Sequence, residues 1–325
     1  MPSYVKNLRD MTKEDFQETG GKAANLGELA RNGFNVPPAF CVTARSLDHV
    51  IDSNNAMPKI LEISSTLDYD DYDGMEEKTA RIRELISSAR IPRDLEAEIR
   101  QGIDGLRGPS AGEPFVAVRS SVAVRDSSVS SFPGMMDTFH FLKGEAQIVE
   151  YIRKCWASLW TARAAMRRHQ MGIDHGKGII APLVQKMVNA DVAGVMFTAN
   201  PITGSREEIV IEANWGLGES LVSGESINDY FVLGKGSPPA IKEKRIQKKT
   251  IMVTLDKEKG VGRKKYDVPS ELSEAATLSD SQLRELAARG GEIENVFQFP
   301  QDIEWAYEKA TLYLLQSRKI KGLKA

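Results

Sequence analysis

The segment from Ala117 to Thr138 combines residue types that suit a phosphate site. The residues at 116–118 are typical of a strand end, and Arg119 follows them, where its planar guanidinium could bind an anion through two hydrogen bonds. A serine-rich run at 127–131 leads into the turn Phe132-Pro133-Gly134, whose glycine would let backbone N–H groups approach a phosphate. A flexible, serine-rich surface loop is an equal alternative for this segment alone.

A second cation lies near the N-terminus, in GGKAANLGELARNGFNVPPAF. This pattern predicts a glycine-rich turn at Gly20-Gly21 and a helix through Ala30, which ends before Gly33 and Pro37. Lys22 would lie in the first turn of that helix. The helix dipole favours anions there, so an anionic ligand would resolve the mismatch. The alternative is a solvent-exposed lysine on a surface helix.

A third set lies near the C-terminus, where two strands separated by a turn predict a hairpin. If the turn is centred on Ala310, Glu304 pairs with Gln316 and Asp302 pairs with Arg318. Alternation would gather these residues on one face of each strand: Asp302, Glu304 and Ala306 on the first, Leu314, Gln316 and Arg318 on the second.

That pairing has a chemical consequence. A carboxylate beside an amide oxygen is a reasonable pair of ligands for Mg²⁺, which commonly takes one or two protein oxygens and fills its shell with phosphate and water. The adjacent Arg318 would neutralise the outermost phosphate. An exposed polar hairpin face is the alternative for Glu304 and Gln316.

Other patterns indicate the scaffold that must position these residues. Two helices are expected at Gly74–Ala89 and Pro92–Leu106, and one long amphipathic helix at Glu145–Met171, with Trp156 and Trp160 in its core. Ser279 and Gln282 form a capping box before a helix to about Asn295. Strands are expected at Tyr4–Leu8, Ile179–Val188, Val192–Gly204, Ile209–Glu212 and Thr250–Leu255.

The 325 residues suggest about two domains. We place the boundary after residue 190, which gives an N-terminal lobe, 1–190, with a helical scaffold at 45–110, and a C-terminal lobe, 191–325. A net charge of −2 gives no electrostatic argument for nucleic acid or a membrane surface. With two distant cysteines, no signal-type N-terminus and no membrane-length apolar run, we expect a soluble, cytoplasmic protein.

The standard nucleotide signatures, G-x-x-x-x-G-K-S/T and G-x-G-x-x-G after a strand, are absent. Several motifs together nevertheless resemble the nucleotide-binding part of the phosphoenolpyruvate synthase and pyruvate, phosphate dikinase family, which includes rifampin phosphotransferase. In family order they are GGKAANLGEL (20–29), VRSS (118–121), FPGMMDT (132–138), VQKMV (184–188), GVMFTANPITG (194–204), WGLGE (215–219), and PQDIEWA with LLQSR (300–318).

The resemblance implies an α+β, ATP-grasp fold whose two lobes bind ATP in the cleft between them. Lys22, Arg119 and Arg318 would be catalytic phosphate-binding cations, the loop Pro133–Thr138 would cover the phosphates, and Glu304 with Gln316 would bind Mg²⁺. The backbone of 185–188 would read adenine. The implied ATP-binding residues are Lys22, Arg119, Gly134, Met135, Met136, Asp137, Thr138, Gln185, Lys186, Met187, Val188, Glu304, Gln316 and Arg318.

The implied activity is transfer of the β,γ-diphosphoryl group of Mg-ATP to a histidine on a separate swivelling domain, with release of AMP. The four histidines, His49, His140, His169 and His175, lie in none of the family's phosphohistidine contexts. We therefore expect a partial enzyme that needs a phosphohistidine domain or subunit and an acceptor-binding domain or subunit.

Several points stay open at this stage. The acceptor could be pyruvate, a phenol, an antibiotic or another molecule, and the subfamily is undecided, because FPGMMDT resembles the dikinase branch and FTANPITG the synthase branch. A stand-alone subunit, as in phenylphosphate synthase systems, and an excised domain both fit. The alternative function is a non-catalytic regulatory or partner-binding module that keeps the fold.

Overall fold

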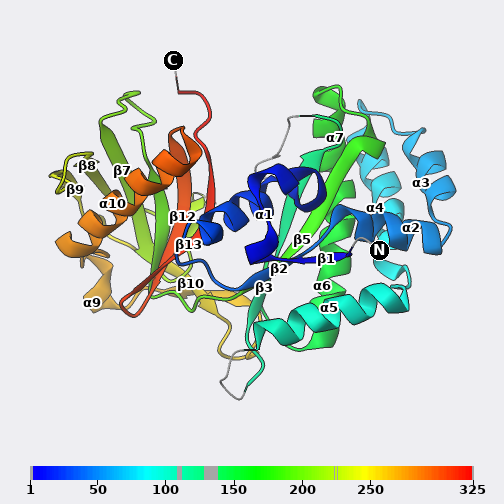
Figure 1. The fold of residues 1–325 in the computed structure, drawn as a ribbon, viewed down its shortest axis with the longest axis horizontal. Coiled ribbons are helices and arrows are strands. Elements are labelled where there is room, and N and C mark those ends of the chain that lie inside the picture. Colours follow the sequence, from blue (N-terminus) through cyan, green and yellow to red (C-terminus); the bar gives the residue numbers. More distant parts are fainter. Residues whose placement is uncertain (1–2, 108–111, 128–137, 223, 225, 324–325) are drawn as a thin grey trace. The chain divides into compact units, whose positions relative to one another are not determined.

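The computed structural model describes residues 3–107, 112–127, 138–222, 224 and 226–323 (Figure 1). Helices and sheets are mixed, in agreement with the α+β class. The chain divides into two compact units. One comprises the residues up to Arg31 together with Pro38–Met187, and the other comprises Asn32–Pro37 together with the residues from Val188 onward.

The first unit contains a five-stranded sheet in the order β1-β2-β5-β3-β4, with every neighbouring pair antiparallel. Its strands are β1 (Val5–Asn7), β2 (Ala39–Val42), β3 (Val116–Val124), β4 (Thr138–Leu142) and β5 (Gly178–Lys186). Its helices are α1 (Phe16–Arg31), α2 (Ala44–Ser53), α3 (Met57–Ser64), α4 (Tyr72–Ser88), α5 (Arg93–Leu106), α6 (Glu145–Ala157) and α7 (Ala162–Gln170), with short 3-10 segments η1 (Leu8–Asp10), η2 (Lys13–Asp15), η3 (Ser158–Trp160) and η4 (His175–Lys177).

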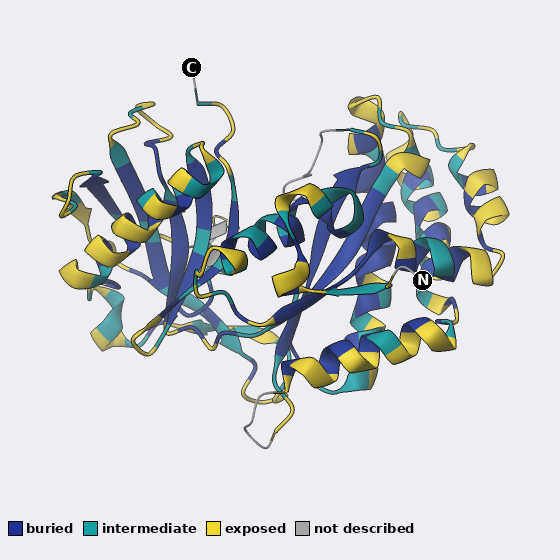
Figure 2. Cartoon of the chain, viewed as in Figure 1, coloured by how far each residue is buried: buried dark blue, intermediate teal, exposed yellow. Residues whose placement is uncertain are grey.

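The two faces of this sheet bury different sets of side chains. Alternate residues of β3, among them Val116, Val118 and Val122, join the main hydrophobic core, which helices α2–α6 complete. The intervening residue Ala123 belongs to a smaller cluster that includes Phe16 of α1. The inner strands β2, β3 and β5 are therefore buried on both faces, while the helices expose their outer surfaces (Figure 2).

The second unit is built on a six-stranded antiparallel sheet in the order β13-β12-β6-β7-β8-β9, and β10 and β11 form a separate two-stranded ribbon. Helix α10 packs on one face of the sheet, where a Cβ at Gly290 would lie 2.9 Å from Met196 Sδ. Its elements are β6 (Val192–Phe197), β7 (Glu208–Trp215), α8 (Glu219–Val222), β8 (Asp229–Gly234), β9 (Ile241–Arg245), β10 (Ile251–Leu255), β11 (Arg263–Asp267), α9 (Ser270–Ser273), α10 (Asp280–Phe297), β12 (Gln301–Glu308) and β13 (Thr311–Lys319).

Several sequence-based predictions of elements are confirmed, with ends that shift by one or two residues. Helices α4 and α5, strands β1, β5 and β10, and the hairpin β12–β13 are where the patterns predicted them. The capping box also forms, because the Ser279 side chain accepts from the N–H of Gln282 and the Gln282 side chain accepts from the N–H of Ser279. Trp156 and Trp160 are buried, as core residues should be.

Three expectations were wrong. The single helix at Glu145–Met171 is two helices, because Thr161 adopts an extended backbone and its side chain caps α7 by accepting from Ala164 N. Two strands end elsewhere than predicted, since β6 stops at Phe197, short of Gly204, and β7 continues to Trp215, beyond Glu212. Arg119 does not follow a strand end but lies inside β3, which pairs with β5 along its whole length.

No helix in the described part of the chain is both long and apolar enough to cross a membrane.

Candidate functional site

The turn that carries Lys22 is fixed to strand β3. At Gly20, φ is 72° and ψ is 163°, so this residue interrupts α1, and Lys22 lies just after the break. A Cβ at Gly20 would lie 2.4 Å from the main-chain carbon of Ser121, so only glycine permits this approach. Ala23 N donates to Ser121 Oγ at 2.9 Å. The half-buried Lys22 is thus held beside the strand that also carries Arg119.

Arg119 is buried in the sheet, with 8% of its surface exposed, and its Nη1 donates to Gln185 Oε1 at 3.0 Å. The two residues lie on neighbouring strands, because Ala117 of β3 pairs with Gln185 of β5. Gln185 is 3% exposed, and its Nε2 has no hydrogen-bond partner among the described residues. A buried amide donor without a partner is costly, so an acceptor on a ligand would satisfy it.

Thr138 also lies beside Arg119, because the two residues pair across β3 and β4. It is the first residue of β4 and the one member of the predicted phosphate-covering loop that can be placed. The predicted residues Gly134, Met135, Met136 and Asp137 lie outside the described residues. Their assignment stays a prediction.

The predicted adenine-reading segment spans the end of β5, and the division between the two units falls between Met187 and Val188. The N–H of Lys186 donates to Pro38 O at 2.8 Å, and the N–H of Met187 donates to Phe115 O at 2.8 Å. Both N–H groups are engaged within the first unit. Recognition of a base by these two residues therefore has to use other backbone atoms.

In the second unit, the hairpin pairs the residues as predicted. Glu304 lies opposite Gln316 and Asp302 lies opposite Arg318. Gln316 Nε2 donates to Glu304 Oε1 at 2.9 Å. The turn is tighter than expected, since Glu308 pairs with Thr311, and an irregularity after Glu304 restores the predicted register.

That irregularity corrects one expectation about the strand faces. Leu314 pairs with Trp305 instead of sharing the face of Gln316. Leu314 and Trp305 are both buried, at 2% and 0% exposure. A bulge lets β13 bury its leucines in the core and still present Gln316 beside Glu304.

Asp302 belongs to the same group of side chains, although it was not among the predicted ligands. Its Oδ2 accepts from Arg318 Nε at 2.8 Å and from Arg318 Nη2 at 2.7 Å. Burial raises the pKa of Asp302, Arg318 opposes that rise, and Glu304 adds to it. The signal in the sequence was the alternation that puts Asp302 two residues before Glu304 on the same face.

The donor set in this hairpin suits a hard cation. Glu304 and Gln316 offer adjacent carboxylate and amide oxygens, the ligand types that Mg²⁺ takes together with phosphate and water. As the residues stand, the amide nitrogen of Gln316 faces Glu304, so a metal bound by both oxygens requires the amide to turn. The described residues contain no group of three or more His, Cys, Asp or Glu arranged for a metal.

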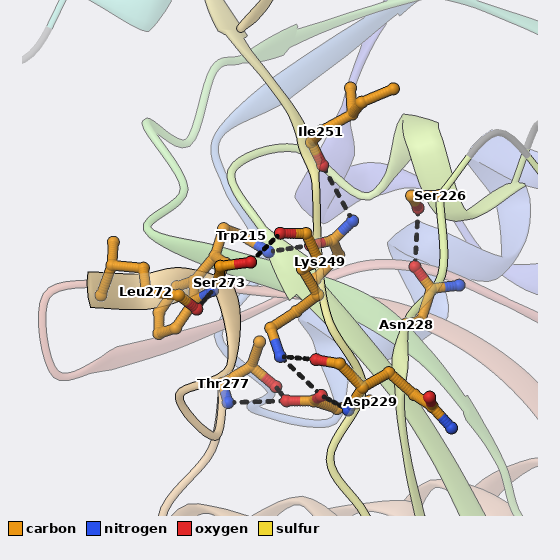
Figure 3. Close-up of polar contacts among 11 residues, drawn as sticks. Trp215, Ser226, Asn228, Asp229, Lys249, Ile251, Leu272, Ser273 and Thr277 are labelled. Atoms are coloured by element: carbon orange, nitrogen blue, oxygen red, sulfur yellow. Dashed lines mark hydrogen bonds and ion pairs between the residues drawn. The ribbon is translucent and has the colours of Figure 1, made fainter. Parts of the chain in front are cut away.

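Two further motifs have structural explanations. In WGLGE, a Cβ at Gly216 would lie 2.4 Å from Val253 O, and Trp215 Nε1 donates to Leu272 O at 2.9 Å, so this stretch packs against β10 and α9 (Figure 3). In ANPITG, the Asn200 side chain accepts from the N–H groups of Ile202 and Thr203 at 3.0 and 3.1 Å. These contacts shape the turns in the two motifs.

Comparison with known proteins gives a consistent result. Residues 16–325 match the family model described as "Pyruvate phosphate dikinase, AMP/ATP-binding domain". The chain is 42% identical over 322 residues to a probable phosphoenolpyruvate synthase of Methanocaldococcus jannaschii, covering 99% of this chain and 27% of that protein. It is 38% identical over 360 residues to the phosphoenolpyruvate synthase of Pyrococcus furiosus, covering 99% of this chain and 44% of that protein.

The rifampicin phosphotransferase of Bacillus subtilis is 37% identical over 324 residues, covering 99% of this chain and 36% of that protein. The chain therefore spans less than half the length of each of these three relatives. Its motifs, its α+β elements and the match over almost its whole length agree: the chain belongs to the family of pyruvate phosphate dikinase AMP/ATP-binding domains.

Proposed function

We propose that this chain is the ATP-using component of a phosphotransferase, which passes the β,γ-diphosphoryl group of Mg-ATP to a histidine on a separate domain or subunit. The observation that carries the proposal is the family match over residues 16–325 in a chain that retains the predicted cations and oxygen ligands. The proposal includes an ATP-grasp arrangement, in which residues of both units bind one ATP.

In the proposed reaction, a nitrogen of the partner's histidine attacks the β-phosphorus, the bond from that phosphorus to the oxygen bridging to the α-phosphate breaks, and AMP leaves. This step needs positioning and charge stabilisation from this chain, while the partner's histidine supplies the nucleophile. Lys22 and Arg119 hold the phosphates, and Arg318 binds the terminal one. Glu304 and Gln316 hold Mg²⁺, which neutralises charge on the phosphate oxygens.

The residues near Arg119 also fit a ligand rich in oxygens. The buried Nε2 of Gln185 offers a donor, and Thr138 lies beside the arginine. The loop through Gly134 and Asp137 would cover the phosphates, and backbone atoms of 185–188 would contact adenine. These roles come from the family motif and are part of the proposal.

The histidine and the binding site for the final acceptor would be supplied by other domains or subunits. The relatives have room for them, since this chain aligns with 27–44% of the two named phosphoenolpyruvate synthases. The names of the relatives point to different acceptors, because some are phosphoenolpyruvate synthases and others are rifampicin phosphotransferases. The acceptor is therefore not assigned to this chain.

Titration calorimetry with Mg-ATP tests the binding half of the proposal. We expect Mg-ATP to bind, and Glu304→Ala and Arg318→Ala each to weaken binding by about tenfold or more, which corresponds to about 1.4 kcal/mol. Glu308→Ala, on the same strand, serves as the matched control and should bind as the unaltered chain does. No binding, or binding undiminished in both site variants, would contradict the proposal.

The transfer half is tested with ATP radiolabelled at the β-phosphate and candidate histidine-bearing partners. Label on the partner's histidine together with released AMP supports diphosphoryl transfer. Label that remains in ADP points instead to a simple kinase. Binding of Mg-ATP with no transfer to the native partner would identify the chain as a non-catalytic module.

A further inference from the structure

Gln17 makes three hydrogen bonds to the main chain where strand β3 ends. Its Nε2 donates to Val124 O at 3.1 Å and to Ser127 O at 2.9 Å, and its Oε1 accepts from Asp126 N at 3.3 Å. A primary amide is suited to this task, because it offers two N–H donors and a carbonyl acceptor on one planar group. No part of the predicted ATP site explains these contacts.

The contacts of Gln17 complete a second attachment of α1 to β3. The first attachment is at Ser121, which touches Gly20 and accepts from Ala23 N. The helix and the strand run in opposite directions here, since Gln17 meets residues 124–127 and Ala23 meets Ser121. Two attachments, one on each side of the Gly20 break, fix the position of α1 along the length of β3.

The position of α1 along β3 determines where the predicted phosphate-binding cations lie relative to each other. Lys22 directly precedes Ala23, and Arg119 lies two residues before Ser121. A slide of α1 along β3 would carry Lys22 past the arginine. Catalysis by positioning is sensitive to displacements of about 1 Å. A fixed position of α1 therefore matters for the placement of Lys22, even when the fold is stable without it.

Other contacts at the same strand end do not replace Gln17. Arg125 forms an ion pair with Asp48 of α2, and the side chains are 41% and 39% exposed. Lys177 Nζ lies 3.9 Å from Asp126 Oδ2, and both side chains are more than half exposed. Exposed ion pairs hold geometry weakly, and neither of these pairs involves α1.

We propose that Gln17 is a positioning residue, which fixes α1 along β3 and so holds Lys22 in place beside Arg119 for the β- and γ-phosphates of ATP. The inference rests on the proposed function, because it assigns those phosphates to Lys22 and Arg119. Gln17 itself is assigned no contact with ATP. Its effect should therefore be seen only with ligands that carry the phosphates.

Gln17→Met tests the inference, because methionine keeps the length and the helix propensity of glutamine but has no N–H donor. We expect the Kd for Mg-ATP to rise about tenfold and the Kd for AMP to stay within about twofold, since AMP lacks the phosphates that Lys22 and Arg119 would hold. The matched control is Gln101→Met on α5, an exposed glutamine of the same unit, which should change neither Kd.

Ser121→Ala removes the other attachment with little change in volume, and it should show the same selective loss of Mg-ATP affinity. It also keeps the test decisive if Gln17→Met folds poorly. The inference is overturned if either folded variant binds Mg-ATP as the unaltered chain does, or if affinities for AMP and Mg-ATP fall equally. Failure of the unaltered chain to bind Mg-ATP would instead reject the proposed function.

Discussion

Each unit buries a cation completely, and the two cations are compensated in different ways. In the second unit, Lys249 Nζ donates to Asp229 Oδ1 and to Gln247 O, both at 2.7 Å, and neither charged side chain is exposed (Figure 3). The other carboxylate oxygen of Asp229 accepts from Thr277 N and Oγ1 at 2.9 Å. Charge and hydrogen bonds are satisfied together, and the ribbon that begins with β10 is held to β8.

In the first unit, Arg168 has neutral partners. Its Nε donates to His175 Nδ1 at 3.1 Å, its Nη1 donates to Leu159 O at 2.6 Å, and its guanidinium lies 5.1 Å from the Trp160 ring centre. Nη2 is buried without a hydrogen-bond partner among the described residues. Burial lowers the pKa of Arg168 to about 10.

The difference teaches that burial alone does not decide what a charge contributes. Removal of a fully paired cation leaves a buried, unpaired carboxylate, so substitution of that cation is strongly destabilising. Removal of a cation with neutral partners leaves no unpaired charge. While the cation is present, however, it shifts the pKa of neighbouring groups. His175 shows this, because burial first, and Arg168 second, lower its pKa to about 4.

The largest effect is expected from Asp229→Ala. It leaves Lys249 buried without its carboxylate, so the free energy of unfolding should fall by about 3–5 kcal/mol. Urea unfolding measures the change, with Asp267→Ala, an exposed position on β11, as the control. A loss no larger than that of the control would show that the buried pair does not stabilise the unit.

The next largest effect is a pH dependence that centres on His175. Its pKa is lowered to about 4, so between its ordinary pKa and that value the unfolded chain binds more protons than the folded one. The stability that neutral His175 contributes is complete above about pH 6.5 and is lost as the pH falls towards 4. Because the imidazole is only partly buried, solvent screening limits this loss to about 2–3 kcal/mol.

Unfolding measured near neutral pH and at about pH 5 checks that window, because the carboxyl groups titrate mainly below it. The groups facing His175 are Arg168 and His169, which lower its pKa, Asp174, which raises it, and the Tyr69 hydroxyl at 2.5 Å. His175→Gln should flatten the dependence. An unchanged slope in that variant would assign the effect to other groups.

A smaller effect is expected from Arg168→Met. The change removes a desolvated charge and leaves no carboxylate behind, but it leaves Leu159 O without its donor. We expect a loss of about 1–2 kcal/mol, clearly below that of Asp229→Ala. Equal losses in the two variants would remove the distinction between the two buried cations.

The smallest change in stability is expected from Arg318→Ala in the candidate site. The Arg318 side chain is 40% exposed, unlike the fully buried Lys249, so water screens its ion pair with Asp302 and the loss should stay below about 1 kcal/mol. The pKa of Asp302 should nevertheless rise, because Arg318 is the group that lowers it, and carbon-detected NMR titration can follow that carboxyl. A pKa of Asp302 that does not rise would show that the guanidinium does not govern it.

The hairpin shows how far local patterns reach. Alternation and an assumed turn centre at Ala310 predicted the pairing of Glu304 with Gln316 and of Asp302 with Arg318. The pairing holds because the bulge after Glu304 compensates for a turn that is tighter than assumed. The capping box at Ser279 and the helix limits of α4 and α5 have the same local origin. The turn at Gly20 was also predicted, although the helical residues before it, from Phe16, were missed.

The remaining features depend on contacts between distant parts of the chain. Gly20 must be glycine because Ser121 lies against it, and Gln17 is held by a strand end more than a hundred residues away. The burial of Arg119 against Gln185 is set by the pairing of β3 with β5, which no local pattern reports.

The sequence by itself therefore determined the family, most of the elements and the chemical types in each half of the candidate site. Only the tertiary structure decided that Arg119 lies inside a buried strand, that Gln17 and Ser121 fix the Lys22 turn, and that Lys249 and Arg168 are buried with such different partners. The physical reason is that propensity and periodicity act over a few residues. Close approach, burial and charge compensation depend on residues that only folding brings together.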